Sequence, residues 1–248
     1  MSMKKRALQI ALFLAIMLLT FYALFSGRDL SEIGRALMGM SFWYLIPSIA
    51  LAVFFVCAEG FMIWYLLRSM KAQKEGYKAS TLPRCIQYSF IGFFYSGITP
   101  SATGGQPVQL YYMNKDGNRG SDSTVVLMTV AVAYKFVLVV MGLGILLFWL
   151  NPLRQELGNY FPLYLLGLAL NVILVILILG VMLFPKVILK LALLFEGLFI
   201  RLKIWKPSEK REEKINGFID SYQQAVTWLK DHKGSLLVVI FVTFLQRC

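Results

Sequence analysis

The residues of this chain best suited to chemistry form one polar segment, T-P-S-A-T-G-G-Q-P at positions 99–107, which interrupts a hydrophobic run. Its prolines and adjacent glycines do not continue a helix. Lipid supplies no water to free N–H and C=O groups, so irregular backbone at membrane depth is tolerated only beside protein or a polar cavity. Two interpretations stay open. The segment presents backbone dipoles to a polar ligand, or it is an ordinary polar connection between two spans.

Two charged residues lie inside other hydrophobic runs, Glu59 in 42–67 and Lys135 in 124–150. Ionisable residues are costly there and normally face a protein interior or a cavity. Counted from the basic ends of their runs, they lie about 12 Å and about 16 Å deep at helical rise. The functional interpretation is a polar cavity where Lys135 and backbone N–H groups bind an anion such as a lipid phosphate. Glu59 would then balance Lys135 in the empty site.

The competing interpretation of these two charges is a buried structural Glu59–Lys135 pair, or a Lys135 that extends towards an interface. Under the functional interpretation, the candidate ligand-binding residues come from the polar segment and the two charged positions. They are Thr99, Ser101, Thr103, Gly104, Gly105, Gln106, Lys135 and Glu59.

The composition assigns the elements around these residues to an all-α, polytopic integral membrane protein. Of the 248 residues 58% are hydrophobic, and long charge-free runs recur. The net charge of +12 sits mainly in the loops between these runs, as is typical of membrane proteins. No compact basic domain exists, so direct nucleic-acid binding is not expected.

The sequence lacks the signatures of soluble enzymes, and we predict no catalytic residue, metal site or cofactor. It has no phosphate-binding lysine loop and no dinucleotide fingerprint, and its single histidine, His232, cannot form a metal pair. The cysteines Cys57, Cys85 and Cys248 are odd in number and lack metal-ligand spacing, which argues against a disulfide framework.

Five hydrophobic runs approach spanning length: roughly 7–25, 42–67, 124–150, 162–184 and 235–248. The first follows a basic start and lacks a small-residue cleavage site, which favours a retained signal anchor. A span needs about 20 apolar residues, so the last run is incomplete. We therefore expect a C-terminally truncated chain with further helices beyond it.

The Lys/Arg distribution predicts a cytoplasmic N-terminus and cytoplasmic loops at 68–84 and 185–234, the latter with ten Lys/Arg residues. An even number of crossings must separate these loops, and runs 124–150 and 162–184 supply two. The apolar piece 86–98 is about 20 Å long as a helix, too short for a core of about 30 Å. The sequence therefore predicts a re-entrant hairpin over 86–113. The alternative is two tilted full crossings.

Two amphipathic stretches are predicted on the cytoplasmic side. Residues 185–204 suit an interfacial helix or a cytoplasmic extension of the preceding span. Residues 208–233 carry an apolar stripe of helical period on a charged helix, with Ser208 as a plausible N-cap. The stripe consists of Ile215, Phe218, Ile219, Tyr222, Ala225, Val226 and Leu229.

The segment 86–113 resembles the signature of the flippase-like membrane domain of lysylphosphatidylglycerol synthases, the multiple peptide resistance factor family. The T-P-S-A-T-G-G-Q-P core and the Tyr-Tyr-Met exit at 111–113 carry the resemblance, and the span containing Lys135 fits the pattern. In that family a separate C-terminal domain transfers lysine from lysyl-tRNA to phosphatidylglycerol. No such domain is visible in this chain.

The resemblance implies a multi-pass protein of a bacterial plasma membrane that binds and translocates an anionic or aminoacylated phospholipid. Such transport would modify surface charge and resistance to cationic peptides. Two alternatives stay open: part of a phosphatidylglycerol lysyltransferase, or a lipid-binding scaffold for one. The expected partners are the bilayer and a phospholipid substrate, and both an aminoacyl-lipid synthase and a homo-oligomer are compatible with the sequence.

Overall fold

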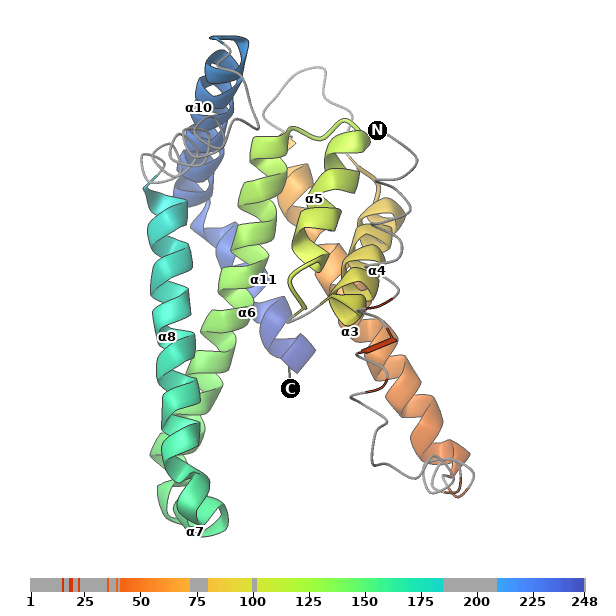
Figure 1. Cartoon of the computed structure of the whole chain (residues 1–248), viewed down its shortest axis with the longest axis vertical. Helices are drawn as coiled ribbons and strands as arrows, with labels where there is room; N and C mark the ends of the chain where they lie inside the picture. Colours follow the sequence, from red (N-terminus) through yellow and green to blue (C-terminus); the bar gives the residue numbers. More distant parts are fainter. Residues whose placement is uncertain are drawn as a thin grey trace.

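The protein is all-helical in the computed structural model (Figure 1). The structure describes residues 41–71, 80–99, 102–184 and 209–247, with Ala15, Leu18, Leu19, Tyr22, Arg35 and Gly39. Within these residues there is no strand. The elements are α3 (Phe42–Lys71), α4 (Leu82–Ile98), α5 (Gly105–Lys115), α6 (Gly120–Phe148), α7 (Leu150–Leu157), the short turn η2 (Gly158–Tyr160), α8 (Phe161–Leu183), α10 (Glu209–Asp231) and α11 (Lys233–Arg247).

Three helical segments of the described chain are long and apolar enough to cross a membrane, namely Phe42–Met70, Gly120–Phe148 and Leu150–Leu183. This confirms the predicted all-helical membrane class. The expected stretch 185–204 lies outside the described residues, and of the expected run 7–25 only Ala15, Leu18, Leu19 and Tyr22 are described, all four in helical conformation. The stretch expected at 208–233 contains α10, and the run expected at 235–248 overlaps α11, which begins two residues earlier at Lys233 and is 15 residues long.

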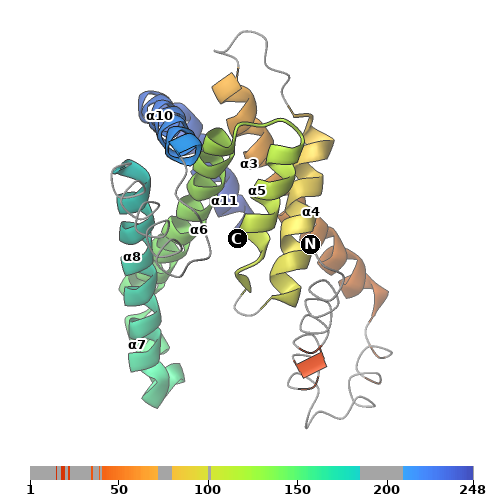
Figure 2. The same cartoon turned by 45° about the horizontal axis from the view of Figure 1, so that its top comes forward.

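Helices α3, α4, α5 and α6 each have one end in a common region, which we call the basic end because Lys71, Arg84, Lys115 and Arg119 lie there. In Figure 1 this end is at the top, beside α10, whereas α7 marks the opposite, far end. Helices α4 and α5 occupy only the half of the bundle near the basic end, side by side in both views (Figures 1 and 2). They therefore form a short hairpin whose turn lies at mid-height.

The turn of this hairpin is held by Thr99. The residue before a proline avoids helical angles, and Thr99 ends α4 in an extended conformation. Its Oγ1 donates to the carbonyl oxygen of Tyr95 at 2.7 Å and accepts the N–H of Gly104 at 2.9 Å. Ala102 adopts a positive φ of 55° in this turn. One hydroxyl thus satisfies backbone groups on both sides of the turn.

Glycines allow the hairpin to approach its neighbours. A Cβ added to Gly60 of α3 would lie 2.6 Å from the Cα of Ile86 in α4. A Cβ on Gly105 of α5 would lie 2.6 Å from the carbonyl oxygen of Gly92 in α4. Small residues are typical where helix backbones pack closely in membranes. These contacts set the spacing of α3, α4 and α5.

A polar latch closes the open ends of the hairpin at the basic end. The Arg84 guanidinium donates to both carboxylate oxygens of Asp116, at 2.5 Å and 3.1 Å, and Tyr88 Oη donates to the same group at 2.5 Å. These donors hold the pKa of Asp116 below its usual range, because they stabilise the carboxylate. The latch connects the first turn of α4 to the residue that follows α5.

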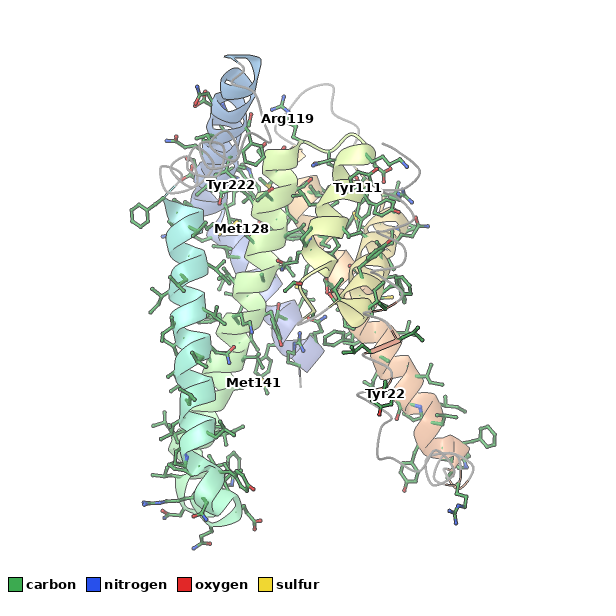
Figure 3. The ribbon with its side chains drawn as sticks, viewed as in Figure 1. Tyr22, Tyr111, Arg119, Met128, Met141 and Tyr222 are labelled. Atoms are coloured by element: carbon green, nitrogen blue, oxygen red, sulfur yellow. The ribbon has the colours of Figure 1, made fainter. Side chains whose placement is uncertain are left out.

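The best-packed apolar region of the described chain also lies near the basic end. Helix α10 contributes four residues of the stripe predicted from the sequence, and Figure 3 shows Tyr222 beside Met128 of α6. The Tyr222 hydroxyl lies 3.5 Å from the Met128 sulfur. The cluster includes Met62, Ile63, Leu66, Leu67, Cys85, Tyr88, Met113, Val125, Val126, Tyr222, Ala225, Val226 and Leu229.

The Gly60→Leu variant tests the close approach of α3 and α4. The larger side chain must displace the Ile86 backbone, so we expect a loss of about 1–3 kcal/mol in the free energy of unfolding. Gly144→Leu is the matched control, because a Cβ at Gly144 would meet nothing within 4 Å. Thermal unfolding in detergent measures both variants. Equal midpoints for Gly60→Leu and the parent would contradict this packing.

Candidate functional site

A cavity of about 530 Å³ lies between the hairpin and helices α3, α6 and α11. Its walls combine aromatic and aliphatic side chains with an unusual number of polar ones for the interior of an apolar bundle. The polar side chains that line it are Glu59, Ser96, Gln106, Gln109, Tyr134, Gln246 and Arg247. A polar cavity of this size is a typical place for a polar ligand group.

One hydrogen bond across the cavity joins α5 to α3. Gln109 Nε2 donates to Glu59 Oε1 at 2.8 Å, and the Gln109 side chain is buried. Gln109 follows Gly105 by four residues, so both lie on the buried face of α5. Gly92 makes room for this amide, because a Cβ there would lie 2.2 Å from Gln109 Nε2. The glycine of α4 thus permits the bond between α5 and α3.

Arg247 supplies a positive charge at another wall of the cavity. Its Cζ lies 3.8 Å from the ring centroid of Tyr134 on α6 and 4.5 Å from that of Phe55 on α3. The aromatic faces attract the guanidinium and hold it in place. Its Nε is buried without a hydrogen-bond partner in the described structure. Gln246 fixes the end of α11 by donating to the carbonyl oxygen of Phe55 at 2.6 Å.

Two ionisable side chains of opposite sign line the cavity, Glu59 and Arg247, and we call it the two-charge cavity. Glu59 is held by an amide and Arg247 by two aromatic rings. Neither arrangement uses up the hydrogen-bonding capacity of the charged group. The cavity can therefore receive a ligand that carries both an anionic and a cationic group.

The predicted site residues other than Lys135 divide into three groups. Glu59, Gly105 and Gln106 line the cavity. Thr99 and Gly104 build the hairpin turn through their hydrogen bond, and Thr103 lies in the same turn. The remaining residue of the polar segment, Ser101, lies outside the described residues.

Lys135 does not join this cavity. Its Nζ donates to Asn171 Oδ1 of α8 at 3.1 Å. Consecutive helix residues point about 100° apart, so Tyr134 faces the cavity whereas Lys135 faces α8. The side chains of Glu59 and Lys135 are therefore hydrogen-bonded to different amides, Gln109 and Asn171, and the Lys135 ammonium lies 5.2 Å from the ring centroid of Tyr134.

Sequence reasoning missed Gln109, Tyr134, Gln246 and Arg247 as cavity residues. Two signals were available in the chain. Gln109 lies one helical turn after Gly105, and Arg247 lies in the last hydrophobic run, where a charge is as costly as at Glu59. No local pattern distinguishes Tyr134 or Gln246 from ordinary packing residues.

The fold and the cavity define a polytopic helical membrane protein with a polar, two-charge cavity inside the bundle. The chain belongs to the family described as the lysylphosphatidylglycerol synthase TM region, whose model matches residues 7–248. It is a multi-pass membrane protein with three candidate spans among its described residues. Comparison with curated proteins and with solved structures finds no significant match.

Double-mutant cycles test which residue is the partner of Glu59. The Gln109→Met substitution removes the donor at nearly constant size and leaves a buried carboxylate unpaired, which costs about 1–3 kcal/mol. We expect Gln109→Met and Glu59→Gln to be coupled when combined. Lys135→Met and Glu59→Gln should instead be additive within about 0.5 kcal/mol. Unfolding in detergent measures all variants. Strong coupling of Glu59 to Lys135 and none to Gln109 would contradict the observed contacts.

Proposed function

We propose that this protein binds and translocates an anionic or aminoacylated phospholipid such as lysyl-phosphatidylglycerol, with the headgroup in the two-charge cavity. Membership of the lysylphosphatidylglycerol synthase TM region family supports a lipid as the substrate class. The transport of such a lipid to the outer leaflet changes the surface charge of the cell. Resistance to cationic peptides is the expected consequence.

The observation that carries this proposal is the presence of Arg247 and Glu59 in the lining of one cavity. A guanidinium binds phosphate oxygens with charge-assisted hydrogen bonds, and the buried Nε of Arg247 lacks a partner. A carboxylate suits the ammonium group of an aminoacyl headgroup. Gln106 and Gln109 add amides for the glycerol and ester oxygens. Gly105, which begins α5 after the hairpin turn, also lines this cavity.

The proposed orientation follows from charge and helix length. The basic end faces the cytoplasm by the positive-inside rule, and the membrane is a bacterial plasma membrane. Helix α5 has 11 residues, about 16 Å at helical rise, which is too short to cross a hydrocarbon core. The α4–α5 hairpin is therefore re-entrant from the cytoplasmic side, and its turn delivers polar backbone to mid-membrane.

A second candidate function is favoured by the family description itself, which names a synthase. In this alternative the chain serves a phosphatidylglycerol lysyltransferase, as its membrane part or as a lipid-binding scaffold for a separate aminoacyl-lipid synthase. Self-association into a homo-oligomer is compatible with either function. Lipid transport by this chain beside an independent synthase would distinguish the two functions.

The Arg247→Gln variant tests the transport function. Outer-leaflet aminoacylated lipid is measured in cells supplied with a separate synthase and normalised to the membrane level of the protein. Loss of the charge-assisted contacts to phosphate should lower exposure about tenfold or more. Arg154→Gln makes the same change on α7, which has no buried residue and lies away from the cavity. This variant should leave the amount of aminoacylated lipid in the outer leaflet unchanged. Full exposure with Arg247→Gln at normal protein level would refute the cavity as the transport site.

Single cysteines at Lys115 and Arg154 test the orientation and the re-entrant hairpin. The background lacks Cys57, Cys85 and Cys248, and the probe is an impermeant thiol reagent. We expect labelling at Arg154 in intact cells and at Lys115 only after permeabilisation, because Lys115 precedes the start of α6 and Arg154 follows its other end. Labelling at Lys115 from outside would show that the hairpin crosses the membrane or that the orientation is reversed.

A further inference from the structure

A second hollow runs along the seam between α6 and α11, on a different face of α6 from the two-charge cavity. Its part near the basic end has a volume of about 230 Å³ and is lined by residues including Val132, Leu179 and Leu229. The next part has about 410 Å³ and reaches Val140 and Phe244. Residues Phe136 and Ile240 line both parts, so the two hollows adjoin each other, and we refer to them together as the groove.

This groove is apolar along its length and charged at one end only. Among the described residues that line it, Lys230 carries the single charge. Lys230 lies in the last turn of α10, its side chain is exposed, and it lines the groove together with Met182 and Leu183 at the C-terminal end of α8. Long lysine side chains place their methylene stems against apolar surface and their ammonium group in water. The groove is therefore apolar along its length and has a cationic group at one end.

We propose that the groove binds one acyl chain of an anionic phospholipid whose phosphate contacts Lys230. The chain would lie along α6 and α11 from the basic end towards mid-membrane, as lipid chains lie in a leaflet. The positive charge is at the end of the groove where headgroups of that leaflet lie, and a lysine near the surface attracts anionic lipid. A zwitterionic lipid offers the same chain without the net negative charge.

This lipid site is separate from the two-charge cavity. Val132, Phe136 and Val140 recur every four residues and share the groove face of α6. Tyr134 faces the two-charge cavity instead. A lipid in the groove would contact α6, α8, α10 and α11 together. It would therefore stabilise the corner between α10 and α11 against the spans, whether or not the cavity transports lipid.

Photo-crosslinking in nanodiscs of unlabelled phosphatidylcholine tests this site. The probe is phosphatidylglycerol with a diazirine near the methyl end of one acyl chain, and phosphatidylcholine with the same label is the comparison. We expect the anionic probe to label peptides 132–140 and 236–244 about fivefold more than the zwitterionic probe. That factor corresponds to about 1 kcal/mol for one lysine beside an anionic lipid. Equal labelling of these peptides by the two probes would overturn the proposal.

Two pairs of variants locate the contacts. Lys230→Glu should reduce labelling by the anionic probe to the level of the zwitterionic one. Lys233→Glu makes the same charge change at an exposed residue outside the groove and should retain the preference. Ile240→Trp should block labelling at Val140 and Phe244 by filling the junction, whereas Leu245→Trp, exposed and outside the groove, should not. Equal effects within either pair would also overturn the proposal, and none of these results depends on transport through the cavity.

Discussion

The hydrogen bond from Gln109 to Glu59 is the contact on which the arrangement of this protein depends. A carboxylate inside an apolar bundle must find a polar partner, because lipid provides none. That partner comes from the hairpin, so the bond attaches α5 to α3 across the cavity. Gly92 leaves the space that the amide occupies, and Gly60 lets α4 reach α3. The two glycines and the Gln109–Glu59 hydrogen bond therefore act together to hold α3, α4 and α5 in contact.

Helix α6 separates three environments by the direction of its side chains. Tyr134 faces the two-charge cavity, Lys135 faces α8, and Phe136 faces the apolar groove. Each step of one residue turns the side chain by about 100°, so three consecutive residues serve three surfaces. Helix α11 repeats this division, with Ile240 in the groove and Arg247 in the cavity. A polar site and an apolar site thus share the same two helices without merging.

The two ends of the α4–α5 hairpin are stabilised by different contacts. At the turn, Thr99 satisfies backbone groups and leaves Gly105 at the wall of the cavity. At the basic end, Arg84 and Asp116 close the hairpin where water can reach them. An exposed ion pair of this kind contributes little to stability on its own. Its value lies in keeping the two short helices in register over the turn that lines the cavity.

The sequence alone determined the all-helical membrane class and the three candidate spans that contain α3, α6 and α8, because composition and hydrophobic run length report burial in lipid directly. It also identified Glu59 as an interior charge. Only the tertiary structure decided which polar groups meet. Lys135, like Glu59, is a charged residue inside a hydrophobic run, yet its direction on α6 gives it Asn171 as a partner. Arg247 and Gln109 reach the cavity through the packing of α11 and α5, and no local pattern encodes a contact between residues so far apart in the chain.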